Sequence, residues 1–475
     1  QMNADGSACA PLAGIAPEND QDSGVLLHDF DPAYAPDGRL VFASTRGYLD
    51  GQSGLRGPTR TPAALEPNAN LYVFDASADP AVRQLTYLLD QELQPSLMTD
   101  GRLIFTAEKR AEDFHQLAGR RMNLDGGDYH PLFAQRPSIG FESATEIVEL
   151  PNRNFAMVAA PLDARDGGGA IVVVNRSIGP DQADRDPADR AFIHSLTDPT
   201  PGAFGGGSGV FRSPAPLPSG RMIASCDLQA SDLTAGSPHY ALCELDPTGA
   251  EAPRQLWAAP NLVALEAVAV YARAPHTFVS RSDEVNGSTR VDPSQQDAIV
   301  HYLDYPLLST LLFSNTRIGR PIDSRVAGLE LLSPSPPPIS AQSFDGIGSD
   351  VVQDRYGRFY QSLRSLGKVQ ADLDGSLRVS VPGGTPLTLA LLDKGGQALQ
   401  FNSGAPFTGP MRQREATQFY PGERVKQAMP RRFFNGLCAG CHGSISGREL
   451  DIGVSVDVLT SASRTMASDE LHELR

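Results

Sequence analysis

Short apolar runs separated by turn residues recur over roughly the first 340 residues of the chain, and this pattern predicts β-strands. One phrase, an apolar run followed by a tight turn and a second alternating run, occurs at residues 31–42, 94–105 and 213–224. Weaker copies occupy residues 145–158 and 266–280. Each copy predicts a pair of antiparallel strands.

The turns inside these copies define the expected hairpins. Asp37-Gly38 and Asp100-Gly101 occupy the turn in the first two copies, and Ser219-Gly220 occupies it in the third strong copy. Because glycine adopts positive φ without steric cost, an Asp-Gly pair predicts a two-residue hairpin loop. We therefore expect these three turns in equivalent hairpins of different sheets.

The spacing of the copies favours a β-propeller. They lie roughly 50–65 residues apart, with further predicted strands at residues 70–74 and 169–174. Four-stranded units arranged around an axis leave few exposed strand edges. We expect a propeller of about seven blades over residues 25–340, and the phrases resemble the PD40/TolB-like propeller repeat. An irregular two-sheet sandwich is the alternative.

Composition and charge agree with this fold and exclude several functions. The 475 residues include 45 glycines and 38 prolines, which favours many turns over a helical bundle. A formal net charge of −16 argues against nucleic acid as a partner, since phosphate binding needs a basic surface. No apolar run approaches the ~20 residues of a membrane-spanning helix. The chain begins at Gln1, and removal of a signal peptide is one explanation, a trimmed chain the other.

The strongest chemical motif lies near the end of the chain. Cys438, Cys441 and His442 form a C-x-x-C-H pattern, which is typical of covalent haem c attachment. In such sites two thioethers hold the haem and the adjacent imidazole binds its iron as the proximal ligand. A zinc half-site and a thioredoxin-like pair are the alternatives, but no second Cys/His pair and no βαβ pattern lies nearby. We expect one covalent haem c per chain.

This haem places the protein outside the cytoplasm, in the periplasm or secreted. An oxidising compartment also predicts a disulfide between Cys226 and Cys243, with two buried thiols as the alternative. Cys9 is left without an assigned partner.

The distal ligand of the iron stays open. The candidate side chains are Met466, Met429, His472, His28, His115 and His130. An iron without a distal protein ligand is the remaining alternative. Asp372 and Asp374, which precede Gly375, are a weak calcium candidate, with an ordinary turn as the simpler interpretation.

The expected fold class is therefore all-β dominated, with a β-propeller, a small β-sandwich-like module and a short helical haem c segment. The expected parts are an irregular leader at residues 1–24, the propeller at 25–340, the small β module at 341–410 and the haem c-binding segment at 411–475. A proline-dense stretch at residues 333–338 predicts a stiff linker, and helices are expected at 424–434 and 467–475.

Several phrases of the C-terminal half occur in an order known from one family. They are Gly375-Ser376-Leu377, Val381 to Leu387, Leu392 to Gln400, Met411-Arg412, Pro421-Gly422-Glu423 and Cys438 to His442, preceded by Asp304-Tyr305-Pro306 and Phe313 to Arg320. This order resembles the haem-bearing module of proteins related to the hydrazine synthase alpha subunit. The resemblance implies a propeller followed by a haem c module.

The chain departs from that family in three places. Residues 424–437 are an insertion between the Pro-Gly-Glu phrase and the haem motif, and Gly443 stands where a glutamate is common. Hydrazine synthase itself has a second, catalytic haem site of unusual ligation, whereas this chain has one C-x-x-C-H motif and Ser446 in place of a tyrosine ligand. What carries over is a propeller with one haem.

Three functions follow from these features. A mono-haem c-type cytochrome would transfer electrons as a subunit of a redox complex, with redox proteins or other subunits as partners. A haem enzyme with an open iron would act on a small nitrogen-oxide, hydroxylamine or peroxide substrate. A structural propeller would organise a larger complex. Because the chain lacks the additional haem, we expect electron transfer.

Overall fold

The fold is given by a computed structural model. It describes residues 29–35, 37–45, 68–132, 142–164, 167–175, 193–197, 209–230, 233, 238–271, 289–313, 323–338, 344–345, 347–401, 409–427 and 471–475. The predicted haem ligands and three of the distal candidates lie outside these ranges, as does one cysteine: Cys438, Cys441, His442, Met429, Met466, His28 and Cys9.

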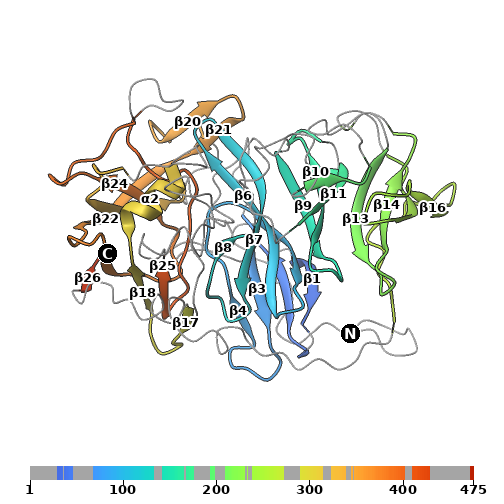
Figure 1. Ribbon diagram of the computed structural model, residues 1–475, viewed down its shortest axis with the longest axis horizontal. Coiled ribbons are helices and arrows are strands. Elements are labelled where there is room, and N and C mark those ends of the chain that lie inside the picture. The colour runs from blue at the N-terminus through green and yellow to red at the C-terminus, as the bar shows by residue number, and fades with distance from the viewer. Residues whose placement is uncertain are drawn as a thin grey trace, which may run out of the picture.

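Four units of four consecutive strands follow one another in the first part of the chain, and the second and third units are joined into one eight-stranded sheet (Figure 1). The first unit contains β1 (Asp29–Tyr34), β2 (Leu40–Ser44), β3 (Asn70–Phe74) and β4 (Val82–Gln84). The second contains β5 (Glu92–Leu97), β6 (Arg102–Ala111), β7 (Phe114–Asn123) and β8 (His130–Pro131). The third contains β9 (Ser143–Glu149), β10 (Phe155–Ala160), β11 (Ala170–Val174) and β12 (Ile193–Ser195). The fourth contains β13 (Val210–Pro216), β14 (Met222–Asp227), β15 (Ala241–Leu245) and β16 (Arg254–Trp257).

Consecutive strands of each unit pair side by side and antiparallel, as in the blades of a propeller. The first strands of successive units, β1, β5, β9 and β13, contact one another. Apolar side chains fill the space between neighbouring units, for example Val158 and Ile171 of the third against Phe211 of the fourth. The central strands are buried on both faces, which explains why β2, β10 and β11 read as continuous apolar runs.

The turns confirm the repeat but differ from the expected loop type. The Gly38, Gly101 and Gly220 turns lie in three different sheets, as expected. Each loop has three residues rather than two: in the first, the Ala35 N–H donates to Arg39 and the Gly38 N–H donates to Ala35. The glycines have φ between 83° and 92°, the left-handed position that closes a type I turn plus bulge. The arginine that follows the glycine also contributes to the turn, because Arg39 forms an ion pair with Asp37 at 2.6 Å.

The second part of the chain forms a separate unit with two sheets, which we call the C-terminal module. One sheet has the order β17 (Thr289–Val291), β25 (Glu423–Gln427), β18 (Asp297–Tyr302), β23 (Leu377–Pro382) and β26 (Leu471–Glu473). The other has the order β22 (Ser362–Gln370), β19 (Gly328–Ser335) and β24 (Thr388–Leu392), and β20 (Val351–Asp354) pairs with β21 (Gly357–Tyr360) beside it. A single apolar core joins the two sheets, as expected for a sandwich-like module.

This module begins earlier in the chain than expected. β17, β18 and β19 pair with strands from residues 362–427, so they belong to the module although they precede residue 340. The proline-dense stretch is not a linker at its start, because Ser333–Ser335 complete β19. Fewer blades than the expected seven are described, since the residues after 289 are used in the C-terminal module.

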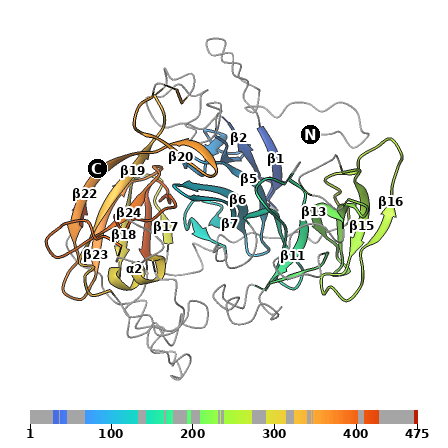
Figure 2. The ribbon, with the colours of Figure 1, turned by 90° about the horizontal axis from the view of Figure 1, so that it is seen from above.

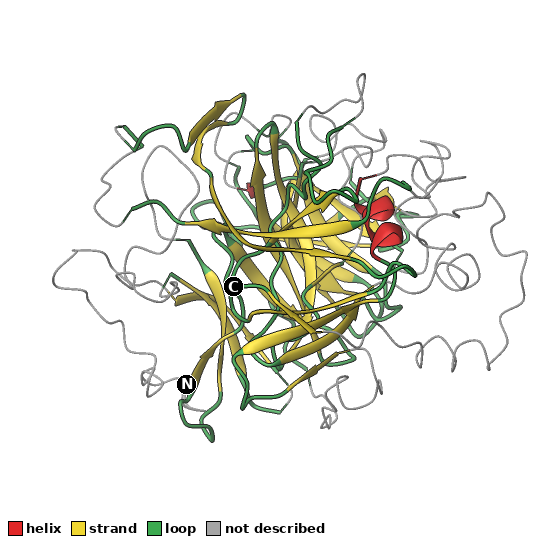
Figure 3. Ribbon diagram, turned by 90° about the vertical axis from the view of Figure 1, so that its left-hand side faces the viewer, coloured by secondary structure: helices red, strands yellow, loops and turns green. Residues whose placement is uncertain are grey.

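Strands replace both expected C-terminal helices where the structure describes them. Glu423–Gln427 forms β25 and Leu471–Glu473 forms β26. The alternation of exposed Arg424, buried Val425 and half-buried Lys426 has the period of a strand, and the sheet supplies its backbone partners. The described helix is α2 (Tyr305–Phe313), whose start is capped by Asp304 through the Leu307 N–H at 3.1 Å. Figure 3, coloured by secondary structure, shows that strands make up most of the regular structure.

Candidate functional site

The segment that contains the haem motif is held at both ends by one sheet. β25 ends at Gln427 and β26 begins at Leu471, so residues 428–470 connect two strands of the five-stranded sheet. β25 runs parallel to β18, and β26 runs parallel to β23, which is antiparallel to β18. The connection therefore leaves and returns at the same end of the sheet. We call this the segment end of the sheet.

A row of basic side chains crosses the sheet at this end. Lys426 lies opposite His301, His301 opposite Arg378, and Arg378 opposite Leu471. Residues directly opposite on neighbouring strands share a face, so these side chains lie on one side of the sheet. This face is half-exposed, whereas the other carries buried residues such as Val300. We call Lys426, His301 and Arg378 the basic row.

A second pair of arginines extends the charge beside this row. Arg424 is two residues before Lys426 on the same face, and it lies opposite Arg290. Arg424 approaches Asp292 at 3.9 Å, and both side chains are exposed. In a chain of net charge −16, this local concentration of positive charge stands apart from the average surface.

The pKa of His301 is lowered to about 4, mainly by burial and in addition by the positive charges of Arg378, Lys426 and Arg424. His301 is therefore neutral at pH 7. The Nε of Arg378 is covered from solvent and has no hydrogen-bond partner in the described part of the chain.

The described distal candidates lie in three different places. His472 is on β26 opposite Val379, which places it on the core side of the sheet rather than in the basic row. The Nε2 of His115 lies 2.8 Å from Glu108 on the neighbouring strand, and His130 is in β8. The structure does not bring these three together in one cluster.

The predicted disulfide is present. Cys226 and Cys243 are bonded, with their Cα atoms 5.9 Å apart. They lie on the adjacent strands β14 and β15, and both side chains are buried in the core of the fourth unit.

A polar ring that the sequence analysis missed lies where the first strands of the units meet. One polar residue near the start of each copy has φ between 51° and 55°: Asp31, Gln94, Glu146, Ser213 and Glu266. The first four sit in bulges of the strands β1, β5, β9 and β13. The Gln94 N–H donates to Asp31 at 3.0 Å, the Glu146 N–H donates to the Gln94 side chain at 2.8 Å, and the Ser213 N–H donates to Glu146. We call these residues the axial ring. Its signal in the sequence was a polar residue at the same place in every copy.

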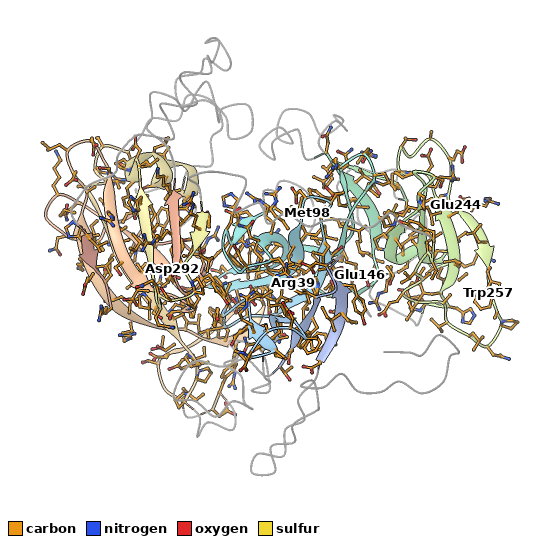
Figure 4. The ribbon with its side chains drawn as sticks, turned by 90° about the horizontal axis from the view of Figure 1, so that it is seen from below. Arg39, Met98, Glu146, Glu244, Trp257 and Asp292 are labelled. Atoms are coloured by element: carbon orange, nitrogen blue, oxygen red, sulfur yellow. A yellow bond between two sulfur atoms is a disulfide. The ribbon has the colours of Figure 1, made fainter. Side chains whose placement is uncertain are left out.

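Burial raises the pKa of Asp31, the Gln94 N–H opposes this shift, and the carboxylates of Glu266 and Glu146 raise the pKa further. Arg212 offsets part of the charge through an ion pair with Glu146 at 3.0 Å. Figure 4 shows Glu146 in the middle of the propeller and Trp257 at its outer end.

Buried ion pairs fix the C-terminal module to the second propeller unit. Lys109 and Arg120 both donate to one carboxylate oxygen of Glu415, at 2.6 and 2.7 Å. Burial opposes ionisation of Glu415, but the two cations overcome it and hold its pKa at about 2. Burial and the charge of Arg120 lower the pKa of Lys109 to about 7, although Glu415 opposes this shift. We call this set the buried clamp.

A second buried pair joins the β20–β21 hairpin to β6. Arg110 is almost fully buried and makes two bonds of 2.7 Å with the carboxylate of Asp354. Its guanidinium also lies 4.0 Å from the ring centre of Phe359. Burial raises the pKa of Asp354, but Arg110 and two backbone N–H groups lower it to about 2. The hairpin is thus anchored by a bidentate ion pair.

The Pro-Gly-Glu phrase is a structural joint. Gly422 has φ of 75°, and a Cβ there would lie 1.9 Å from the backbone oxygen of Asp292. Glu423 is buried and accepts the N–H groups of Tyr420 at 2.7 Å and Asp128 at 3.0 Å. The phrase therefore ties β25 to a propeller loop, immediately before the segment with the haem motif.

The residues of the weak calcium candidate form a turn. Asp374 accepts the N–H and hydroxyl of Ser376 at 2.9 and 2.7 Å, and the Gly375 N–H donates to Asp372 at 2.8 Å. Within the described ranges, no three histidine, cysteine, aspartate or glutamate side chains gather as a metal site would require. Among the same residues, no helix has the length and apolarity needed to span a bilayer.

Comparison with known proteins gives similar solved structures. No protein-family profile and no curated protein matches the chain. The hydrazine synthase of Kuenenia stuttgartiensis is similar over 89% of this chain and 54% of its own, with a TM-score of 0.59 and 14% identity. This chain thus spans about half the length of that protein. At this identity the likeness establishes a shared fold.

Two further structures match over about half of the chain. A TolB protein from Agrobacterium tumefaciens covers 49% of this chain and 62% of its own, with 12% identity and a TM-score of 0.29. A puromycin-hydrolyzing peptidase of Mycobacterium tuberculosis covers 49% of this chain and 39% of its own, with 13% identity and a TM-score of 0.31.

Proposed function

We propose that this chain is an extracytoplasmic mono-haem c-type cytochrome that transfers electrons as one subunit of a redox complex. The C-x-x-C-H motif at residues 438–442 carries the proposal. Cys438 and Cys441 would hold the haem as thioethers, and His442 would bind its iron. The haem supplies a one-electron redox centre when bound. The chain supplies a segment tied at both ends to a rigid sheet.

Features of the described residues support the binding of this group. The strands that precede and follow residues 428–470, β25 and β26, belong to one sheet of the C-terminal module. The nearby face carries positive charge, which suits a cofactor with two carboxylate side chains. The Cys226–Cys243 disulfide supports an oxidising compartment, where haem c is attached.

Electron transfer is favoured over catalysis by what the sequence contains. The chain has one haem motif, whereas the resembling catalytic protein uses an additional haem site. The fold shared with a hydrazine synthase supports a subunit role, because a lone haem needs redox partners at short distance. Other subunits of a complex or a docking cytochrome are the partners that we propose.

The electronic state of the ferric iron tests this proposal. We expect a low-spin spectrum with two axial ligands, recorded by absorption and electron paramagnetic resonance on the purified holoprotein. Alanine variants of Met429, Met466 and His472 would then identify the distal ligand, because the affected variant becomes high-spin. His194→Ala, in the third propeller unit, serves as the matched control and should stay low-spin.

A high-spin, five-coordinate iron in the unaltered protein would contradict the carrier role. If that iron also bound CO, cyanide or NO readily, the protein would be a haem enzyme. Its substrate would then be a small nitrogen oxide, hydroxylamine or peroxide.

A further inference from the structure

Exposed apolar side chains gather at and just beyond the last strand of the fourth propeller unit. Of the twelve large apolar side chains that are exposed in the described part of the chain, eight lie between residues 256 and 271. They are Leu256, Trp257, Leu262, Val263, Leu265, Val268, Val270 and Tyr271. We call them the apolar strip. It begins in β16, and Figure 4 shows Trp257 at the outer end of the propeller.

The large side chains of the strip face water rather than the protein. Ala267 and Ala269 are half-buried, whereas Val268 and Val270 are 77% and 97% exposed. An alternation with this period normally turns the larger apolar side chains toward the core and polar side chains toward water. Here the small side chains face the protein and the large ones face outward, which is the pattern of a surface that another protein covers.

The strip also lacks the charges that normally protect an exposed apolar segment. Glu266 is the single charged residue between positions 258 and 271 of the sequence. The Ala264 N–H donates to Tyr240 at 2.9 Å, so the segment is fixed to the fourth unit on one side. Exposed apolar segments usually carry lysine or other charges that oppose association. Their scarcity here indicates that this surface is built to associate.

The size of the strip fits the centre of a protein–protein contact. A large apolar side chain presents on the order of 100 Å² when fully exposed. The eight side chains, each between 40% and 97% exposed, therefore present on the order of 500 Å² together. A stable interface buries about 800 Å² of each partner, with an apolar centre and a polar rim. The strip supplies such a centre.

The charges around the strip fit a second copy of the same chain. Because the chain has a net charge of −16, two copies repel each other unless they meet at a surface with few charges, such as this one. The side chains of Arg254 and Glu251 beside the strip are 68% and 65% exposed and have opposite signs. In a two-fold contact, a rim with both signs can be complementary to itself.

We propose that the apolar strip is the contact surface of a homodimer, in which a second copy of this chain covers it about a two-fold axis. Such a contact places the strip of one protomer against the strip of its partner. Val268 and Val270 then leave water, and Trp257 supplies an aromatic anchor at the outer end of the contact. The dimer needs no haem, so this inference goes beyond the proposed function.

The mass of the full-length holoprotein in solution tests the inference. Sedimentation equilibrium over a range of protein concentrations should give twice the mass of one chain. Val268→Asp and Val270→Asp each bring like charges together in the contact, so each should raise the dissociation constant of the dimer by about a hundredfold or more. Leu373→Asp is the matched control, because Leu373 is a fully exposed apolar residue of the C-terminal module, and its variant should stay dimeric.

Hydrogen exchange locates the contact on the strip. The backbone N–H groups of residues 262–271 should exchange more slowly at concentrations where the dimer predominates, and this protection should be lost in Val268→Asp and Val270→Asp. Because both valines are exposed, the variants should remain folded, and circular dichroism checks this.

Three outcomes would overturn the inference. They are a monomer at every concentration, a dimer that persists in both aspartate variants, and a chain that is monomeric alone but binds a different protein through the strip. None of them bears on the proposed cytochrome, because covalent haem is measured separately.

Discussion

The axial ring and the buried clamp are both polar, yet they are built in opposite ways. In the axial ring, side chains of one unit accept backbone N–H groups of the next, and the same device repeats around the axis. In the clamp, two buried cations of β6 and β7 share one carboxylate that comes from a distant part of the chain. The ring joins copies of one motif, whereas the clamp joins two different folds. Figure 2 shows the propeller strands and the C-terminal module side by side.

This difference explains how each region should respond to mutation. A ring contact is one of several equivalent hydrogen bonds, so its loss is local and of ordinary size. An ion pair of the clamp compensates buried charges. If one partner is removed, the remaining charges stay buried without compensation, and their desolvation lowers the stability of the fold.

The largest effect should come from the clamp. Glu415→Gln leaves Lys109 and Arg120 without their shared anion, so the free energy of unfolding should fall by about 3–5 kcal/mol. Urea denaturation at pH 7 measures this loss. The matched control is Arg39→Gln, which removes a partly exposed turn ion pair and should cost no more than about 1 kcal/mol. Equal losses of unfolding free energy in both variants would contradict the claim that burial makes the clamp ion pairs stronger contributors to stability.

The clamp also sets the response to acid. Because the folded pKa of Glu415 is about 2, below its ordinary value of 4.5, its contribution is complete above about pH 4.5 and is lost as the pH falls toward 2. Glu415→Gln should remove this part of the acid dependence.

Alanine substitutions of two glycines compare the stability cost of a change in the Pro-Gly-Glu phrase with that of a change in a hairpin turn of the propeller. Gly422→Ala places a Cβ against the Asp292 backbone at positive φ and should cost about 3 kcal/mol. Gly38 also has positive φ, but a Cβ there meets nothing within 4 Å, so Gly38→Ala should cost about 1 kcal/mol. Thermal unfolding of both variants gives the comparison, and a larger loss for Gly38→Ala would reverse our interpretation.

The axial ring should show a smaller, local effect. Glu146→Ala removes the acceptor of the Ser213 N–H and the partner of Arg212, so we expect a loss of about 1–3 kcal/mol. Glu146→Gln keeps a carbonyl acceptor for the backbone N–H and should lose less. Native-state hydrogen exchange at Ser213 should be faster in the alanine variant. Unchanged exchange there would show that the ring bond does not form.

The smallest effect is on the pH dependence of stability. It concerns two buried glutamates, one in the C-terminal module and one in the propeller. Burial raises the pKa of Glu423 and of Glu92 to about 7. A raised carboxyl pKa stabilises the fold below about pH 4.5, and this contribution is lost as the pH rises through 7. Glu423→Gln and Glu92→Gln should each flatten the stability profile between about pH 4.5 and 7. A profile as steep as that of the unaltered protein in both variants would be inconsistent with these shifts.

The repeat made most of the propeller predictable from the sequence. Each copy carries its own turn chemistry, so Gly38, Gly101 and Gly220 indicated their hairpins without knowledge of the fold. The loop type was missed because Asp-Gly serves both two-residue and three-residue loops. The pairing of Cys226 with Cys243 followed from the compartment that the haem motif implied.

The C-terminal module was harder to predict for physical reasons. β17 and β18 obtain their partners from strands 75 or more residues later, and such pairing leaves no local signal. The charged residues at the start of the expected helix at 424–434 fit a helix or a strand equally well, and the neighbouring strands decide the structure of residues 424–427. The basic row was invisible for the same reason: Lys426, His301 and Arg378 meet only through the sheet.

The mass and absorption of the denatured protein test the central claim most directly. The chain should be produced in cells that contain haem c maturation factors, with Cys438→Ala/Cys441→Ala as the matched control. We predict a polypeptide mass increased by one haem, colour that survives acid-acetone extraction, a c-type pyridine haemochrome, and loss of all three in the control. A colourless chain with the mass of the polypeptide alone would contradict the account.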